Sequence, residues 1–281
     1  MTIPYIDAAE VRRRLPPLAA VDALEAALRS GVEPEDETPR TVVEVAGGQM
    51  LVMSSAAATH PVVKIVTVGG EPRVQGLCLA FDGGSLSPAA LLDAAAVTNL
   101  RTSAVSALAV RHLAVPDATR LLVFGRGPQA KAHDEALRAV RPIAHVDVLG
   151  RDAAARDDLV AAADIICCCT TAREPLFDGG LAADHATVVA IGSHEPDARE
   201  VDDALVARST VVVESSASAL REAGDVILAI RSGALNPHRL IPLRALVCGE
   251  QSPAPAAPRL FKSTGMAWED AVTVDAILSD R

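Results

Sequence analysis

The segment Leu121–His133 reads LLVFGRGPQAKAH and joins an apolar run to a helical pattern through two glycines. A strand that turns through Gly-x-Gly into a helix gathers backbone N–H groups at a helix N-terminus, where they can bind a pyrophosphate. Gly125 would permit the tight turn, Gly127 the close approach of phosphate, and Ala130 the packing of helix on strand. The spacing indicates a dinucleotide site, with an ordinary glycine-rich turn as the alternative.

The end of the next predicted strand, at Gly150 and Arg151, bears on the type of dinucleotide. A protein that binds NAD usually carries Asp or Glu here, because the carboxylate holds the ribose 2′-hydroxyl. Gly150 removes this carboxylate, and Arg151 is placed to pair with a 2′-phosphate. The pattern therefore favours NADP(H), while NAD(H) stays the alternative.

Two basic side chains interrupt apolar segments. Lys64 shares one face of the predicted strand 62–68 with valines, where an ammonium is costly unless it meets an anion. It is a candidate to hold a substrate carboxylate or to act as an acid, and an edge-strand lysine that reaches water is the alternative. Arg101 lies in an Ala-rich predicted helix and cannot lose its charge, so it implies a fixed anionic partner. A structural salt bridge would satisfy the same requirement.

His194 follows the predicted strand Thr187–Ile191, in the loop GSHEP. Ligands of a doubly wound sheet bind at the carboxyl ends of its strands, so this loop is expected to face the cofactor. A histidine there could exchange a proton near neutral pH, although a surface histidine is the commoner case. Arg40, just before the first strand, reads by itself as a solvated loop arginine.

The elements that position these residues follow two patterns. From Thr41, short segments of period two joined by glycine turns predict a mostly antiparallel sheet. Asp93 is placed to cap a long helix that runs to about residue 114. Beyond it, apolar strands alternate with helices, which predicts a parallel sheet covered on both faces. These strands are expected at residues 120–124, 145–149, 164–169, 187–191 and 210–213.

The two ends of the chain are predicted to be helical. Apolar positions at helical spacing predict a helix over 11–31, with a break at Pro16 and Pro17. The stretch 253–258 is rich in proline and reads as a linker. The residues after it, RLFKSTGMAWEDAVTVDAIL, are expected to form one final helix.

Composition excludes several classes of protein. The 281 residues carry a net charge of −10 without a basic block, so nucleic acid and anionic membrane are poor partners. Charged residues interrupt every apolar stretch before the ~20 residues of a membrane span. The N-terminus lacks a signal pattern and the cysteines number five, which predicts the reducing cytoplasm. Histidines and cysteines lack zinc spacing, so we expect no metal.

Several motifs together resemble the ornithine cyclodeaminase/mu-crystallin family. They occur in the family's order over most of the chain, and read VVKIVTV, DAAAVTNLRTSAVSALAVRHLA, VFGRGPQAKAH, AIGSHEPDAREVDDAL, REAGDVILAI and LFKSTGMAWED. The resemblance implies an α/β protein of two domains. Residues 1–117 plus 259–281 would form an α+β domain, with a mostly antiparallel sheet, for substrate binding and dimerisation. Residues 118–258 would form a shortened Rossmann domain.

The family's members pass hydride between nicotinamide C4 and the α-carbon of an amino or imino acid. By resemblance, Arg40, Lys64 and Arg101 grip the substrate carboxylate, and Lys64 or His194 handles the proton. The positions implied to contact the cofactor are Thr102, Gly125, Arg126, Gly127, Gln129, Ala130, Arg151, Thr170 and Gly192.

Two departures from the family's pattern indicate which of the family's activities this chain is expected to have. By the resemblance, cyclodeaminases carry acidic residues at the positions of His194 and Leu51. The lack of these carboxylates here disfavours a diamine substrate. We therefore expect an NADPH-dependent reductase of a cyclic or linear imino acid, reversible as an amino-acid dehydrogenase and acting as a homodimer. The alternatives are an ornithine or lysine cyclodeaminase and a non-catalytic, crystallin-like nucleotide-binding protein. The segment between Arg151 and Asp164 is shorter than usual, which implies a trimmed adenine pocket.

Overall fold

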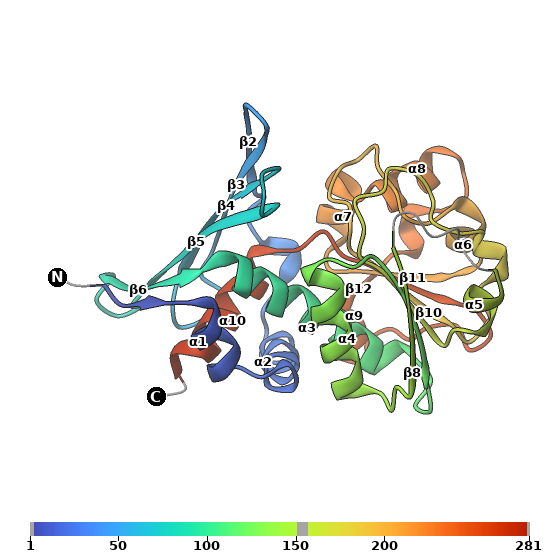
Figure 1. Ribbon diagram of the computed structural model, residues 1–281, viewed down its shortest axis with the longest axis horizontal. Helices are drawn as coiled ribbons and strands as arrows, with labels where there is room; N and C mark the ends of the chain where they lie inside the picture. Colours follow the sequence, from blue (N-terminus) through green and yellow to red (C-terminus); the bar gives the residue numbers. More distant parts are fainter. Residues whose placement is uncertain (1–2, 151–156, 280–281) are drawn as a thin grey trace. The chain divides into compact units, whose positions relative to one another are not determined.

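The computed structural model describes residues 3–150 and 157–279. The chain forms two compact units, one of residues 1–105 and 266–281 and the other of residues 106–265 (Figure 1). The division falls within helix α3 (Ala94–Leu113), after Val105. Residues 106–117 and 259–265, which we expected in the first domain, thus belong to the second unit.

The first unit is built on a six-stranded sheet of order β1-β6-β5-β4-β3-β2. All its pairings are antiparallel except that of β1 with β6. Glycine 47, with φ of 98°, lies in the turn that joins β2 to β3, as the sequence predicts. The strands are β1 (Tyr5–Ile6), β2 (Thr41–Val45), β3 (Gly48–Ser55), β4 (Val62–Val68), β5 (Val74–Phe81) and β6 (Pro88–Asp93).

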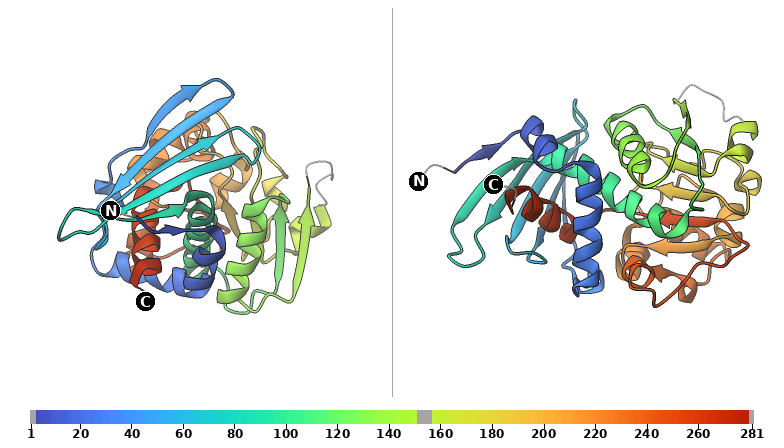
Figure 2. Two further views of the ribbon diagram at one scale, coloured as in Figure 1. Left: turned by 60° about the vertical axis from the view of Figure 1, so that its left-hand side comes forward. Right: turned by 90° about the horizontal axis from the view of Figure 1, so that it is seen from below.

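Helices cover one face of this sheet. The last helix, α10 (Ala267–Ser279), packs on β3, β4 and α2 (Pro17–Arg29), and Figure 2 shows it against the sheet. Helix α2 buries Ala20, Val21, Leu24 and Leu28, the stripe that its helical spacing predicts. It follows α1 (Ala8–Arg14) and precedes the 3-10 turn η1 (Pro34–Asp36).

The second unit contains a seven-stranded parallel sheet of order β12-β11-β13-β10-β9-β7-β8. Its strands are β7 (Arg120–Phe124), β8 (His145–Leu149), β9 (Ile165–Cys168), β10 (Thr187–Ala190), β11 (Thr210–Val213), β12 (Ile241–Pro242) and β13 (Arg259–Lys262). Its helical elements are α4 (Pro128–Val140), α5 (Asp157–Ala162), η2 (Gly179–Leu181), α6 (Asp203–Arg208), α7 (Ser216–Glu222), α8 (Gly224–Arg231), η3 (Pro237–Arg239) and α9 (Leu243–Val247).

The five predicted parallel strands and the long helix capped by Asp93 are confirmed. The Asp93 carboxylate accepts a hydrogen bond of 2.8 Å from the backbone of Ala96. The prediction of one final helix was wrong, because Arg259–Lys262 forms strand β13 between β10 and β11. All four residues are buried, and both neighbouring strands supply hydrogen-bonding partners that a helix at this place would leave unpaired.

Within residues 3–150 and 157–279, no helix has both the length and the apolar character that a membrane crossing requires.

Candidate functional site

Lys64 is buried in the first unit beside a carboxylate from the end of the chain. Alternation along β4 turns Lys64 to the covered face, where it is 1% exposed. Its Nζ lies 2.8 Å from Oδ1 and 2.6 Å from Oδ2 of Asp270, in the first turn of α10. The ammonium is therefore held in an ion pair within the covered side of the sheet.

Arg101 of α3 joins the same cluster. Its Nη1 donates to Oε2 of Glu269 at 2.7 Å, and its Nε donates to Oδ1 of Asp270 at 3.1 Å. Two cations thus meet two carboxylates, and Asp270 serves both cations. The sequence required an anionic partner for each cation, and the structure identifies these partners as Glu269 and Asp270.

The surroundings make Lys64 more acidic than an ordinary lysine. Burial lowers the pKa of its ammonium, and the positive charge of Arg101 acts in the same direction against the attraction of Asp270. Cys78, its cross-strand neighbour on β5, stays a neutral thiol, because burial raises its pKa to about 12. An ammonium with a lowered pKa gives up its proton more readily than that of an ordinary lysine.

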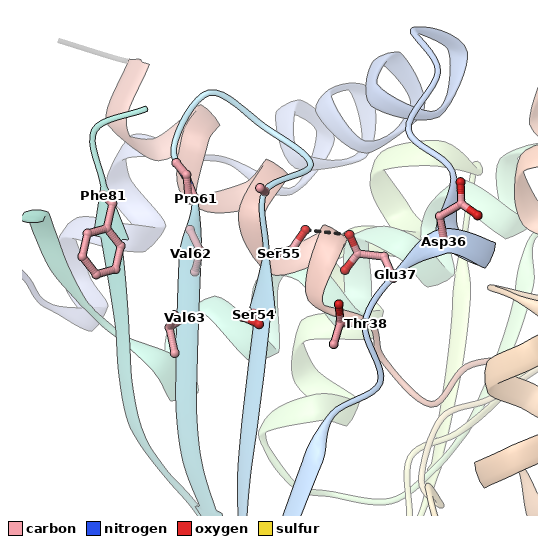
Figure 3. A pocket seen from close by; sticks show the side chains of 10 residues that line it. Asp36, Glu37, Thr38, Ser54, Ser55, Pro61, Val62, Val63 and Phe81 are labelled. Carbon is pink, nitrogen blue, oxygen red and sulfur yellow. Dashed lines mark hydrogen bonds between the residues drawn. The ribbon is translucent and has the colours of Figure 1, made fainter. Parts of the chain in front are cut away.

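A pocket of 430 Å³ opens beside these strands in the first unit (Figure 3). Glu37 and Ser55 point toward one another there, and the Ser55 hydroxyl donates to Glu37 at 2.7 Å. Burial raises the pKa of Glu37, and the charge of Asp270 adds to this effect. The negative charge of the buried Asp270 thus influences the pKa of Glu37. The lining residues are Asp36, Glu37, Thr38, Ser54, Ser55, Ala56, Pro61, Val62, Val63 and Phe81.

Arg40 and Thr102 are the other two predicted site residues of the first unit. Arg40 is half-buried and comes one position before Thr41, which pairs with Val52. Met53, the next residue of β3, pairs with Lys64, so the strand register places Arg40 two strands away from Lys64. Thr102 follows Arg101 on α3 and is 6% exposed.

In the second unit, the glycine-rich turn has the geometry of an anion site. Gly125 adopts a φ of 118°, and a side chain there would collide with the Cys169 carbonyl oxygen. Gly127 caps α4 without a side-chain hydrogen bond, and none of the described atoms lies within 4 Å of the place of a Cβ. The first-turn N–H groups of α4 therefore have room for a ligand, which fits the pyrophosphate of a dinucleotide.

Gly150, at the end of β8, makes room for Arg126. A Cβ at Gly150 would lie 3.0 Å from Nε and 3.2 Å from Cζ of the Arg126 side chain. The guanidinium therefore lies against Gly150, at the end of β8. Arg151, which we expected to supply the cation here, lies outside the described residues.

A single carboxylate holds the two loops that carry Thr170 and Gly192. Glu200 is fully buried, and its Oε1 accepts from the backbone N–H of Thr170 at 2.9 Å and from its hydroxyl at 2.7 Å. Its Oε2 accepts from the N–H of Gly192 at 2.7 Å. The loops after β9 and β10 are therefore fixed to one another. Burial raises the pKa of Glu200, and the charge of Lys262 opposes the shift.

A buried lysine positions the loop of His194. Lys262 of β13 donates to the carbonyl of Ser193 at 2.7 Å and lies 2.9 Å from the Asp225 carboxylate. His194 itself is half-buried directly after Ser193. The remaining predicted contacts, Gln129 and Ala130, lie in the first turn of α4.

The structure groups Lys64 with Arg101 in the first unit, and Gly125, Thr170 and Gly192 near carboxyl ends of strands in the second. Sequence reasoning missed the carboxylates and the lysine that hold these groups. A charged residue within an apolar segment is the sequence feature that could have identified them, as it identified Lys64. The residues it missed are Glu37, Glu200, Asp225, Lys262, Glu269 and Asp270.

Comparisons with known proteins agree with this arrangement. The model of the ornithine cyclodeaminase/mu-crystallin family matches residues 5–159 and 153–280. A Δ1-pyrroline-2-carboxylate/Δ1-piperideine-2-carboxylate reductase of Azospirillum brasilense is 32% identical over 95% of this chain and 93% of its own. The ketimine reductase mu-crystallin of Rattus norvegicus is 31% identical over 92% and 90%. The structure of Thermococcus litoralis Δ1-pyrroline-2-carboxylate reductase in complex with NADH and L-proline superposes with a TM-score of 0.92, at 25% identity over 99% and 97%.

Proposed function

The chain belongs to the ornithine cyclodeaminase/mu-crystallin family, and we propose that it reduces the C=N bond of an imino acid with a nicotinamide dinucleotide as hydride donor. The observation that carries this proposal is the pair of buried cations, Lys64 and Arg101, on the covered side of the sheet. Each cation is already paired with a carboxylate, Asp270 or Glu269, so the cluster by itself does not require an anionic substrate. The proposal is supported further by the curated relatives named above, which are imino-acid reductases.

The substrate is an α-imino acid, either a cyclic ketimine such as Δ1-pyrroline-2-carboxylate or a linear imine. Arg40, Lys64 and Arg101 hold its carboxylate. Asp270 holds both cations in place before the substrate arrives, so little ordering remains for the binding step.

Lys64 is the first candidate for the proton donor, because its pKa is lowered and its ammonium points into the cluster. His194 is the second candidate, on the loop after β10 that Lys262 holds through Ser193. In the opposite direction the same group would accept the proton, and the protein would act as an amino-acid dehydrogenase.

The cofactor is a nicotinamide dinucleotide, which supplies the hydride when bound, and we propose that NADP(H) is preferred. Gly125, Gly127 and the N-terminus of α4 would hold the pyrophosphate. The guanidinium of Arg126 over Gly150 would meet a 2′-phosphate, where NAD-binding proteins place a carboxylate. Further contacts are assigned to Thr102, Gln129, Ala130, Thr170 and Gly192.

We also propose a homodimer through the open face of the six-stranded sheet. Val43, Ile65 and Leu77 share that face by strand register and are 38%, 45% and 44% exposed. A contiguous apolar sheet face of this kind is typical of a protein interface. Sedimentation or light scattering should give twice the chain mass, and Ile65→Glu should shift it toward the monomer.

A cytoplasmic, reducing environment completes the proposal. It is supported by five cysteines that are all free thiols, including two whose sulfurs lie only 3.5 Å apart.

The test is NADPH oxidation with Δ1-pyrroline-2-carboxylate, Δ1-piperideine-2-carboxylate, and pyruvate with ammonia or methylamine, beside ammonia release from L-ornithine. Oxidation with any imino acid, without ammonia from ornithine, supports the reductase and ranks its substrates. Ammonia from ornithine without net NADPH change would replace it by a cyclodeaminase. If neither assay shows activity and neither NADPH nor NADH changes the melting temperature, the reductase proposal is wrong and the non-catalytic alternative is favoured.

A further inference from the structure

Three soft ligand groups converge in the second unit, and the reductase chemistry uses none of them. One nitrogen of His133 and the Sγ atoms of Cys167 and Cys169 lie within 4.8 Å of one another. The two sulfurs are 3.5 Å apart. Cys167 lies in β9 and Cys169 directly follows its last residue, Cys168, which faces the apolar core. His133 reaches them from α4, and we call these three residues the Cys–His cluster.

The spacing of the cluster suits a tetrahedral cation. Zinc binds cysteine sulfur at about 2.3 Å, so two sulfurs of a tetrahedral site lie about 3.8 Å apart. The observed separation of 3.5 Å requires only a small opening of the two side chains. Two thiolates and one imidazole form the ligand set that selects zinc among common divalent ions.

Hydrogen bonds fix the tautomer of the His133 imidazole. Its Nδ1 lies 2.8 Å from the Gln129 carbonyl oxygen, which can only accept, so Nδ1 carries the proton. The lone pair of Nε2 then accepts from the Ser106 hydroxyl at 2.9 Å, and a cation bound at Nε2 would replace this hydrogen bond. Metal-binding histidines commonly donate their second nitrogen to a backbone carbonyl in this manner.

Cysteine binds a metal as the thiolate, so a cation at Cys167 and Cys169 would release two thiol protons on binding. Cys167 is fully buried, whereas Cys169 is partly exposed and offers the route of entry.

We propose that His133, Cys167 and Cys169 bind one divalent cation of the zinc class, with a fourth position left for an oxygen ligand. Ligand spacing along the chain predicts no metal, because these ligands come from a helix and a strand end that only the fold brings together. The site adjoins the dinucleotide turn, since the N–H of Cys169 donates to the Phe124 carbonyl at 2.8 Å and its own carbonyl packs against Gly125. A bound cation would tie α4 to β9 beside that turn.

The test is a titration of the purified, chelator-treated chain with Co²⁺ under a phosphine reductant, followed by displacement with Zn²⁺. We expect one equivalent of Co²⁺, with the near-ultraviolet thiolate-to-cobalt absorption and the visible bands of a tetrahedral ion. Cys167→Ser, Cys169→Ser and His133→Ala should each weaken binding at least about 100-fold. Cys168→Ala, in the same tripeptide but on the opposite face, should bind as the parent does.

A second measurement on the unaltered chain guards against variants that fail to fold. Zn²⁺ should protect Cys169 from alkylation, read by mass spectrometry, whereas the partly exposed Cys248 should react equally with and without the metal. The site is overturned if the chain takes up no Co²⁺, if Cys168→Ala loses binding as the ligand variants do, or if Zn²⁺ leaves the labelling of Cys169 unchanged.

Discussion

Lys64 and Asp270 form an ion pair of 2.6 Å that joins the middle of the first unit's sheet to the helix that ends the chain. Both side chains are almost completely buried, and Asp270 also accepts from Arg101. One carboxylate therefore separates two buried cations. This arrangement has consequences for stability as well as for catalysis, because charge that is removed from water depends on its partner.

Asp270→Ala should destabilise the protein strongly. Removal of one partner from a buried ion pair costs about 3–5 kcal/mol, because the remaining charge stays buried without compensation. Urea denaturation of both proteins measures the loss in the free energy of unfolding. Asp275→Ala is the matched control on the same helix, since its partner His60 is partly exposed and such pairs contribute about 0–1 kcal/mol. Equal losses for the two variants would contradict the assigned role of Asp270.

Lys64→Ala and Arg101→Ala should each lower kcat/KM for the imino acid at least about 30-fold. A hydrogen-bonded charge pair that loses one member costs about 2 kcal/mol or more, and about 1.4 kcal/mol corresponds to a factor of ten. The affinity for the dinucleotide should stay unchanged, which melting shifts with NADPH can verify. Arg29→Ala, which removes an exposed arginine paired with Glu25, serves as control. Near-normal turnover in either active-site variant would remove it from the proposed carboxylate site.

The rate should depend on the ionisation of Lys64. Burial and then the charge of Arg101 lower its pKa below 10.5, so the donor loses its proton at a lower pH than an ordinary lysine. In the reductive direction kcat/KM should therefore fall as the pH rises through this lowered pKa. Lys64→Arg keeps a charge that does not titrate, and its reduced rate should lack the alkaline fall. If Lys64→Arg retains the fall and His194→Gln loses it, His194 is the donor.

Sequence reasoning found the unusual cations but not their partners. An ammonium on an apolar strand is costly wherever the chain folds, so Lys64 stood out by itself. Asp270 lies 206 positions away, and no local pattern reports a contact between residues so distant in the chain. Lys262 was not identified as a candidate because its segment was predicted to be a helix. Like Lys64, it is a buried lysine in an apolar strand.

Periodicity located the strands that alternate with helices and missed β13. Strands β7 to β11 alternate with helices and carry continuous apolar runs, which local patterns register well. Strand β13 is as long as β9, β10 and β11, but its insertion between β10 and β11 depends on pairing with residues far back in the chain. The Cys–His cluster was invisible for the same reason, because its ligands come from different βα units.

Arg126→Ala should reduce the preference for NADPH over NADH. The guanidinium packs where a side chain on Gly150 would lie, at the end of β8, and a charge-assisted pair with a 2′-phosphate is worth about 1.5–3 kcal/mol. The KM for NADPH should rise about 10- to 100-fold while that for NADH changes little, as steady-state kinetics with both cofactors would show. Arg231→Ala, at an exposed arginine of the same unit, should leave both values unaltered. If Arg126→Ala raises the two KM values equally, the arginine binds the part that the cofactors share, and the 2′-phosphate needs another partner.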